Sequence, residues 1–426
     1  RKAEKDPERC FAVLFLDFDR FKNVNDSMGH DVGDDLLRQI AQRLTESMRP
    51  SNTAARPGQC DTIARFGGDE FVVLLDELDS AEDAAWFADH ILATLSEPYR
   101  LSGHDVFSTA SIGLVFQRGP GAATPAELIR DADTAMYEAK MAGKGCHRMF
   151  DDSMRQRVQR RHHLESDLRA ALIRDELFLE YQPIVNLHTG ELESAEALAR
   201  WRHPAHGLVS PGEFIPIAED TGLILEFGEW TLRKACEQLM EWRCADDDLL
   251  PLAVSVNLSR KQFALAGLPN MVGRILAETG MDPSRLHLEI TESTVMDDVE
   301  HAVRVLGKIK AQGVQIVMDD FGTGYSSLAC LQQLPFDVLK IDRTFVAGLD
   351  ANRDLMAMIH AVATLSSNLG IHIVVEGIET ASQLATLQSL DFASGQGFLF
   401  SRPVPPDRIR EAHDRLAELR AFRDAA

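Results

Sequence analysis

The chain has 426 residues, of which 45% are hydrophobic and 26% charged, and its formal net charge is −22. This length and apolar content suffice for two or three domains with their own cores, which excludes a disordered chain and a small disulfide scaffold. The excess of acids argues against a binder of nucleic-acid polymers, because such proteins neutralise phosphates with clustered lysine and arginine. An anionic ligand would need metal ions to offset the acidic surroundings.

The six cysteines are scattered, with no CxxC pair and no histidine at zinc-binding spacing. We interpret them as reduced thiols of a cytoplasmic protein. No run approaches the ~18 apolar residues of a transmembrane helix, and residues 1–5 lack a signal-peptide core, so we expect no membrane contact from this fragment. Because an initiator methionine is absent, we expect the fragment to come from a longer protein that could be membrane-anchored.

Residues 1–150 predict a compact α+β domain. An apolar, β-rich run from Phe11 to Asp19 predicts a strand, and apolar residues at helical spacing predict a helix from Val32 to Met48. Residues 62–66 and 70–75 flank Gly67-Gly68, as in a hairpin with a glycine turn. The remaining elements that we expect are a helix over 81–95, a strand over 106–116 and a helix over 125–142.

Acidic residues gather at this hairpin. Asp69 and Glu70 follow the two glycines, which would let a nucleotide approach the backbone. Asp17 and Asp19 end the first strand, and acids on a strand end and a neighbouring hairpin can hold magnesium against a triphosphate. Taken alone, Gly-Gly-Asp is also simply a good turn.

Residues 151–174 form a charged run that includes RQRVQRRHH and predicts a linker helix. Its basic residues could contact nucleic acid, but a solvated helix face is the simpler interpretation. From residue 175 to 426, strand-like and helical segments alternate. Eight strands in about 250 residues fit a (β/α)8 barrel, and we expect them at residues 178–185, 193–201, 252–259, 286–293, 314–324, 336–345, 371–380 and 394–403.

Polar residues lie within or near the ends of these strands, where the rim of such a barrel holds its active site. Buried carboxylates need a partner or a metal, and oxygen ligands favour magnesium or manganese over zinc. Each residue alone has an ordinary structural explanation, such as a lysine that reaches the surface. The set consists of Glu196, Asn257, Glu289, Asp319, Asp320, Lys340, Glu376 and Gln396.

Asp319 and Asp320 are adjacent, so on a regular strand they would face opposite ways. Both reach one site only where the strand gives way to the loop Gly322-Thr323-Gly324. One of them could then bridge two ions, and a two-metal pair would activate a water and stabilise charge on a phosphate. Lys340 adds a cation that could orient the water.

The ordered motifs of the second region resemble the EAL phosphodiesterases, a similarity that covers residues 164–404. The resemblance implies a TIM-like (β/α)8 barrel with an antiparallel strand, and hydrolysis of the bacterial second messenger cyclic di-GMP to linear pGpG. The motifs are Glu196-Ala197-Leu198 with Ala199-Arg200-Trp201, Gln182-Pro183, Val256 to Ser259, Leu288 to Glu292, Asp319 to Gly324, Leu339 to Asp342 and Glu376 to Glu379.

The resemblance also implies residue roles. The first Mg²⁺ or Mn²⁺ ion would be held by Glu196, Asn257, Glu289 and Asp319, and the second by Asp319 and Asp320. Glu376 would support the water that the metals bind, and Lys340 would help to position it, so that the catalytic set is Glu196, Lys340 and Glu376. Glu292 would order the loop of the acidic pair. The candidates for substrate binding are Gln182, Leu198, Arg200, Glu292, Gln396 and, more weakly, Glu379.

The first region resembles the GGDEF diguanylate cyclases, which implies a nucleotide-cyclase-like domain with a ferredoxin-like palm. The motifs are Phe15 to Lys22, Asn25, Gly33-Asp34, Gly67 to Phe71, Ser111 to Gly113 and Ala139-Lys140. In the implied site, Mg²⁺ is bound with GTP by Asp17, the carbonyl of Phe18 and Asp69. The other implied contacts are guanine recognition by Asn25 and Asp34, phosphate binding by Lys140 and Lys144, and metal binding or 3′-hydroxyl activation by Glu70.

Two departures from the GGDEF pattern stand out. The family's opening helix and the segment before its first strand are absent, so we expect an N-terminally truncated domain. The arginine of the product-inhibition motif is replaced by Gly58, although Asp61 is kept and Arg56 lies two positions out of register. We therefore expect this inhibition site to be absent.

The leading hypothesis is a metal-dependent phosphodiesterase for cyclic di-GMP that is regulated by a GTP-binding GGDEF domain. A bifunctional enzyme acting mainly as a cyclase is an alternative, and a cyclase that joins two GTP molecules would require a homodimer. A non-catalytic receptor or scaffold for cyclic di-GMP is another. A generic TIM-barrel metabolic enzyme would fit the fold but not these motifs.

Overall fold

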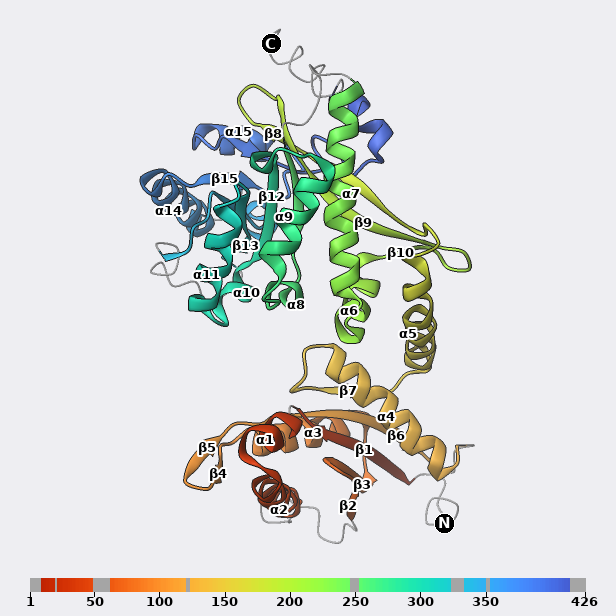
Figure 1. Cartoon of the computed structure of the whole chain (residues 1–426). Coiled ribbons are helices and arrows are strands. Elements are labelled where there is room, and N and C mark those ends of the chain that lie inside the picture. The colour runs from red at the N-terminus through yellow and green to blue at the C-terminus, as the bar shows by residue number, and fades with distance from the viewer. Residues whose placement is uncertain are drawn as a thin grey trace. The chain divides into compact units, whose positions relative to one another are not determined.

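The computed structural model describes residues 9–19, 21–48, 62–119, 123–245, 253–322, 333–349 and 353–413 (Figure 1). The chain divides into two compact units, Arg1–His162 and His163–Ala426. None of the helices in the described ranges combines the length and the apolar character that a membrane crossing requires.

The first unit is built on a five-stranded sheet with β1 (Cys10–Phe18) at its centre. β1 is buried along almost its whole length, as its apolar sequence predicts. It pairs antiparallel with β3 (Glu70–Leu78) on one side and with β6 (Ala110–Arg118) on the other. The outer strands are β2 (Thr62–Gly67), antiparallel to β3, and β7 (His147–Met149), parallel to β6.

Helices cover both faces of this sheet. Because side chains alternate along a strand, Leu14 and Leu16 face a core shared with helices α2 and α3, whereas Val13 and Phe15 pack with α4. α3 and α4 each begin with a capping box, formed by the N-cap residues Ser80 and Thr124 that precede them. The helices are α1 (Phe21–Met28), α2 (His30–Ser47), α3 (Ala81–Leu95) and α4 (Pro125–Met141).

The strand expected over residues 106–116 is two separate elements. Ser102 and Gly103 both have positive φ and form a tight turn between β4 (Tyr99–Leu101) and β5 (His104–Val106). This turn pairs β5 with β4 in a small hairpin, so β5 does not join the main sheet. The predicted strand is therefore present as β6 over residues 110–116, but its predicted start at Val106 was wrong because β6 begins at Ala110. The helix expected to begin at Val32 begins at His30 and is preceded by α1.

Helix α5 (Asp152–Ala171) lies within the predicted linker segment. In the first unit, Arg155 donates two hydrogen bonds to the buried carboxylate of Asp131. In the second unit, Leu164, Leu168 and Ala171 are fully buried in a core cluster. These three residues share one buried helix face, which the charged composition of the segment did not indicate.

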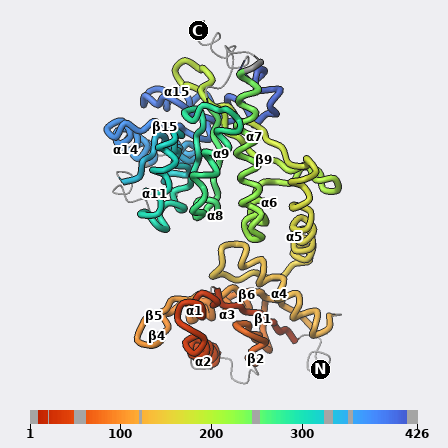
Figure 2. The backbone as a smooth tube through the Cα atoms, viewed as in Figure 1, coloured from red at the N-terminus to blue at the C-terminus, as the bar shows by residue number. Residues whose placement is uncertain are grey.

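The second unit is a closed eight-stranded barrel, as predicted. Seven strands run parallel, and β8 runs antiparallel to both of its neighbours, β9 and β16. The first and last strands of the barrel, β8 and β16, therefore pair with each other, and the yellow and blue parts of this unit meet in Figures 1 and 2. The strands are β8 (Leu177–Asn186), β9 (Leu192–His203), β11 (Ala253–Asn257), β12 (Leu286–Thr291), β13 (Gln315–Phe321), β14 (Val338–Ile341), β15 (His372–Val375) and β16 (Ser394–Gly395).

The eighth strand is much shorter than the expected segment 394–403. After Gly395 the chain turns against Ile378: Ile378 donates its N–H to Gln396, and Leu399 donates its N–H to Ile378. A Cβ at Gly397 would lie 2.1 Å from the carbonyl oxygen of Ile378, so only glycine fits this approach. After Gly395 the backbone packs against Ile378 and no longer pairs as a strand. The alternation of apolar residues in the sequence does not indicate where this change occurs.

Helices surround the strands, and apolar residues from both fill the space between them. β9 runs on past its pairing with β11 to form a small sheet extension with β8 and with β10 (Gly207–Val209). The helices are α6 (Pro211–Thr221), α7 (Ile224–Ala245), α8 (Arg260–Phe263), α9 (Leu268–Thr279), α10 (Glu292–Met296), α11 (Val299–Lys310), α13 (Arg343–Ala347), α14 (Arg353–Leu369) and α15 (Ala381–Ser389).

Candidate functional site

Lys340 lies at the centre of a cluster of carboxylates in the barrel. Its Nζ is 2.6 Å from Glu376 Oε1, 2.8 Å from Glu289 Oε2 and 3.1 Å from Glu196 Oε2. Asp319 Oδ1 lies 3.7 Å away. The lysine side chain is 1% exposed and comes from β14, which lies between β13, which carries Asp319, and β15, which ends one residue before Glu376. One ammonium faces four carboxylates, so the cluster keeps a negative charge.

The pKa shifts show how incomplete this neutralisation is. Burial raises the pKa of Glu289 well above its ordinary value and that of Glu376 to about 7, despite the nearby lysine. Burial also acts on Glu196, but Lys340 and hydrogen bonds from Gln396 and Asn257 outweigh it, so its pKa is lowered. Burial alone would lower the pKa of Lys340, yet the carboxylates hold it well above its ordinary value. A further cation would relieve this imbalance.

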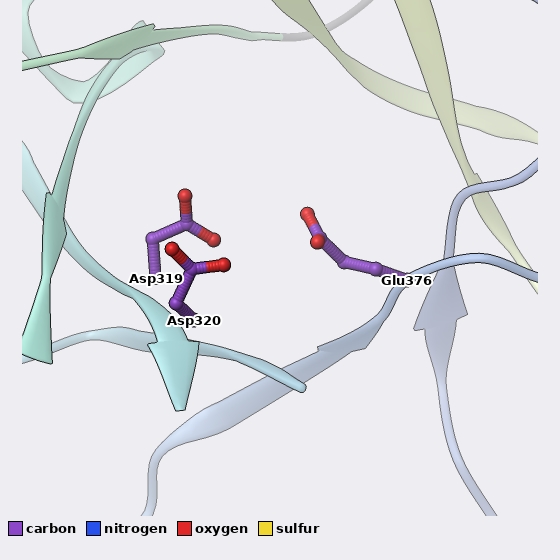
Figure 3. Close-up of side chains that lie close together, drawn as sticks. All are labelled: Asp319, Asp320 and Glu376. Carbon is purple, nitrogen blue, oxygen red and sulfur yellow. The ribbon is translucent and has the colours of Figure 1, made fainter. Parts of the chain in front are cut away.

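A β-bulge brings Asp319 and Asp320 to one site. Between paired residues of β13 and β14, β13 has these two aspartates where β14 has only Lys340. Asp320 adopts a left-handed backbone with φ of +55°, which redirects its side chain. Carboxylate oxygens of Asp319, Asp320 and Glu376 lie within 4.8 Å of one another, and Figure 3 shows the three groups pointing toward a common space. Sequence analysis expected the regular strand geometry to end at the following loop, but the irregularity lies within β13.

Other oxygens of the cluster are also available. Asn257 Nδ2 and Gln396 Nε2 each donate a 2.8 Å hydrogen bond to Glu196. Glu289 Oε1 and Asp319 Oδ1 are buried and have no hydrogen-bond partner among the described residues. Buried oxygen atoms without donors are costly unless a cation binds them. The residues therefore fit a hard divalent ion such as Mg²⁺ or Mn²⁺.

Glu292 lies beside the acidic pair rather than in the cluster. It is 2% exposed, and its Oε2 accepts a 3.2 Å hydrogen bond from the N–H of Gly322. Gly322 has φ of +94°, and a Cβ there would lie 2.4 Å from the ring of Phe345. This contact holds the residue that follows β13. Thr323 and Gly324 lie outside the described residues.

The structure places the expected substrate-binding residues at several positions. Leu198 and Arg200 line a cavity of about 270 Å³ that Asn257 also borders. Gln182 is 8% exposed and donates to the carbonyl of Ser401, and Gln396 belongs to the carboxylate cluster. The side chain of Glu379 is exposed on the segment before α15, and its backbone N–H donates to Gln383. The structure does not bring Glu379 into the cluster.

Sequence analysis missed Glu180. Its Oε2 accepts a 2.8 Å hydrogen bond from Arg200 Nε, and the two side chains are 20% and 16% exposed. Glu180 lies two residues before Gln182 on β8, so the sequence could have indicated that the two side chains share a face of the strand. The sequence could not indicate that Glu180 pairs with Arg200, because that contact depends on the register between β8 and β9.

A second cavity, of about 370 Å³, occupies the barrel interior. Lys340 and Glu289 border it, but Asp319, Asp320 and Glu376 do not, so it lies on the other side of the lysine from the acidic cluster. Apolar residues of β8, β13, β14 and β15 form part of its wall. Its polar residues include His287, Ser255, Asp337 and His372.

In the first unit, strand pairing brings Asp17 and Glu70 together. They are direct partners in the antiparallel register of β1 and β3, and Lys140 Nζ lies 2.7 Å from Asp17 Oδ1. Burial raises the pKa of Asp17 despite this lysine, and burial followed by the charge of Asp17 raises that of Glu70. Asp69 lies in the turn beside Gly68, which has φ of +51°. The turn residues are thus Gly68-Asp69 rather than Gly67-Gly68.

Helices α1 and α2 bring Asn25 against Gly33. A Cβ at Gly33 would lie 1.9 Å from Asn25 Oδ1, an oxygen that is buried and lacks a hydrogen-bond partner in the described part of the chain. Asp34 is exposed beside them, and Lys144 is exposed in a left-handed turn after α4. Phe18 ends β1, with its ring packed against Phe71.

The carboxylate of Asp19 is held by hydrogen bonds within the first unit. Its carboxylate accepts hydrogen bonds from Thr109 at 2.7 Å, Ser111 at 2.9 Å and the N–H of Gly145 at 3.1 Å. These bonds tie the end of β1 to β6 and to the turn after α4. Arg56, Gly58 and Asp61, on which the inhibition-site prediction depends, lie outside the described residues.

The fold and the carboxylate cluster define a TIM-barrel protein with a site for oxygen-bound metal, preceded by a nucleotide-cyclase-like domain. A sequence model of the EAL domain matches residues 165–403, and one of the diguanylate cyclase GGDEF domain matches residues 1–146. The chain therefore belongs to the EAL family and carries a GGDEF domain before its EAL domain.

Two relatives from Pseudomonas aeruginosa align over most of the chain. "Bifunctional diguanylate cyclase/cyclic di-GMP phosphodiesterase MucR" is 44% identical over 402 residues, 94% of this chain and 57% of MucR. "Cyclic di-GMP phosphodiesterase NbdA" is 38% identical over 416 residues, 97% of this chain and 51% of NbdA. The chain thus spans about half the length of these relatives.

A solved structure, "PaMucR Phosphodiesterase, c-di-GMP complex", covers 58% of this chain and 99% of its own, with 46% identity and a TM-score of 0.56. The fraction of this chain that it covers is close to the fraction that the barrel unit occupies. Its name states that it contains cyclic di-GMP.

Proposed function

We propose that the barrel hydrolyses cyclic di-GMP to linear pGpG with Mg²⁺ or Mn²⁺. The observation that carries this proposal is the bulge that turns both Asp319 and Asp320 toward Glu376, around a buried lysine. A site for polar substrates alone would not need so many buried acids with so few cations. The names of MucR and NbdA support cyclic di-GMP as the substrate.

Within this proposal, Glu196, Asn257, Glu289 and Asp319 would hold one ion, and Asp319 with Asp320 a second. Bound there, divalent ions would supply Lewis-acid stabilisation of a phosphate. Asn257 and Gln396 orient the carboxylate of Glu196 through their hydrogen bonds. Glu376 lies beside Asp319 and Asp320, where it is suited to accept a proton from the attacking water, and Lys340 holds its carboxylate in place.

We further propose that residues 1–150 bind GTP and regulate the barrel, that residues 151–174 link them, and that residues 175–426 form the phosphodiesterase domain. The GGDEF domain keeps the acids expected for a nucleotide-bound Mg²⁺. Leu198, Arg200, Gln182 and Gln396 are proposed to contact the dinucleotide. Cys146 and Cys236 form no disulfide with the described residues. We also propose a reducing, cytoplasmic environment, in which disulfides are rare.

Diguanylate cyclase activity is the second candidate function. Asp17 and Glu70 lie opposite each other in register, with Lys140 beside Asp17, which is an arrangement suited to a metal-bound triphosphate. The name of MucR includes this activity. Such a reaction would need two domains facing each other, so we propose that it depends on a homodimer.

The deciding experiment incubates the full chain separately with cyclic di-GMP and with GTP, and identifies the products by mass. We expect pGpG from cyclic di-GMP in Mg²⁺ or Mn²⁺, no product after chelation by EDTA, and recovery when metal is restored. Formation of cyclic di-GMP from GTP would establish the second function. Binding of cyclic di-GMP without hydrolysis in either metal would instead support the receptor alternative.

A further inference from the structure

The β8–β9 hairpin presents one face that carries most of the proposed dinucleotide contacts. In its antiparallel register, Phe178 is opposite Arg200, Glu180 opposite Leu198, and Gln182 opposite Glu196. Since alternate residues of a strand share a face and opposite residues lie together, these six side chains lie on the same side of the hairpin. Glu180 is thus surrounded by residues proposed to bind metal or substrate.

Contacts from two directions hold the guanidinium of Arg200. Its Nε donates a 2.8 Å hydrogen bond to Glu180 Oε2, and its Nη1 donates a 3.1 Å hydrogen bond to the carbonyl of Ala199. Within the described ranges, Nη2 has no hydrogen-bond partner. The arginine also lines the 270 Å³ cavity that Leu198 and Asn257 border. The side chain is held at Nε and Nη1, which leaves the N–H groups of Nη2 for a ligand.

We propose that Glu180 is a positioning residue that orients Arg200 toward a phosphate of the cyclic dinucleotide. This inference rests on the proposed phosphodiesterase function. An unrestrained arginine loses much rotamer freedom when it binds, whereas one already held by Nε loses less. The planar guanidinium has donors on two edges, so a carboxylate on Nε leaves an edge for a phosphate oxygen.

The negative charge of Glu180 has an opposite effect that must be separated from orientation. A carboxylate beside Arg200 reduces the attraction of that arginine for an anion. If orientation dominates, Glu180→Gln keeps a hydrogen-bond acceptor for Arg200 and preserves substrate binding. Glu180→Ala removes the acceptor and should weaken substrate binding. If charge dominates, both substitutions tighten binding. The pair of variants therefore distinguishes the two effects.

The test measures kcat and KM for cyclic di-GMP hydrolysis by the full chain. The set comprises the parent, Glu180→Ala, Glu180→Gln, Arg200→Ala and the double variant Glu180→Ala/Arg200→Ala. Glu191→Ala is the matched control, because Glu191 is exposed in the loop of the same hairpin and contacts Thr189. Thermal unfolding of each variant shows whether the fold is kept.

We expect Glu180→Ala to raise KM about 10-fold with kcat within about two-fold, a change of about 1.4 kcal/mol in apparent binding. Glu180→Gln and Glu191→Ala should stay within about two-fold of the parent in both constants. In the Arg200→Ala background, removal of Glu180 should change KM no further, because a residue that acts through Arg200 has no effect without it.

Three results would overturn the inference while leaving hydrolysis established: an unchanged or lower KM in Glu180→Ala, an equal rise in Glu180→Gln, or an additive rise in the double variant. A parent chain that neither hydrolyses nor binds cyclic di-GMP would overturn the proposed function and this inference together.

Discussion

The two units of the chain hold their acidic side chains in opposite ways. In the barrel, Glu196 is 6% exposed and Glu289 and Lys340 are each 1% exposed, and hydrogen bonds from Asn257 and Gln396 fix the first of them. In the first unit, the residues that carry the proposed chemistry lie on a hairpin turn and at a strand end, and are only half-buried. The barrel site is built into a core, whereas the GGDEF site lies at the edge of one.

This difference indicates in which unit the residues of the proposed site also contribute to folding stability. A buried carboxylate is tolerated only while its partners remain, so each barrel residue supports the fold as well as the reaction. A half-buried carboxylate keeps contact with water and can be removed at little cost to folding. Substitutions should therefore affect the two units differently.

The largest expected effect is that of Glu196→Ala. It removes an expected metal ligand and the acceptor of three hydrogen bonds, so pGpG formation should fall by roughly 100-fold or more, since even indirect support of a metal site is often worth about 10 to 100-fold. Product formation is measured against Glu191→Ala, which should match the parent. Hydrolysis at the parent's rate in Glu196→Ala would remove this residue from the site.

At Asp320, the effect of the side chain on hydrolysis can be separated from the effect of the backbone conformation on stability. Asp320→Asn and Asp320→Ala should both lower hydrolysis about 10 to 100-fold, since each removes a carboxylate from the cluster. Asparagine tolerates the left-handed backbone better than alanine, so only Asp320→Ala should cost a further ~1 kcal/mol of stability. Activity assays and urea unfolding test the two parts. Equal stability of the two variants would show that the bulge carries no such strain.

A pH-dependent stability is expected from His287 in the barrel interior. Burial lowers its pKa to about 4, with Asp337 opposing and His372 adding to this shift. In the unfolded chain its pKa is about 6.5, so the unfolded state binds the proton first as the pH falls. The unfolding free energy of the barrel should be unaffected by this group above about pH 6.5 and should decrease between pH 6.5 and 4.

The loss over that window is up to about 3 kcal/mol. Urea unfolding of the barrel, followed by tryptophan fluorescence at pH 7 and pH 5, measures it. His287→Gln cannot take up this proton, so its stability should change less between the two values. The same decrease in parent and variant would assign the effect to other groups.

The smallest effect on the barrel is expected from the double change Asp69→Ala and Glu70→Ala. Hydrolysis without GTP should stay within about two-fold of the parent, because these residues belong to a different unit, while any cyclase activity should disappear. If GTP regulates the barrel, addition of GTP should change pGpG formation in the parent but not in this variant. A large loss of hydrolysis without GTP would mean that Asp69 and Glu70 contribute to the activity of the barrel.

Much of the architecture could be predicted because local patterns and motifs act over short distances. The eight strands of the barrel, its antiparallel member and the central strand of the first unit are all present in the structure. Errors arose where long-range pairing decided the outcome. Residues 104–106 form a separate two-stranded hairpin with residues 99–101 instead of joining the main sheet. The last barrel strand ends at Gly395, before Gly397 packs against the backbone of Ile378.

The sequence by itself determined the order of the two domains, the residue types at the strand ends and the expected family, because these follow from periodicity and motif spacing. Only the tertiary structure decided that Asp319 and Asp320 face one site from within a strand, that Asp19 holds a turn, and that Glu180 pairs with Arg200. Each of these outcomes depends on strand register and on backbone conformation at single residues. Those are set by packing and hydrogen bonds between segments far apart in the chain, which no local pattern contains.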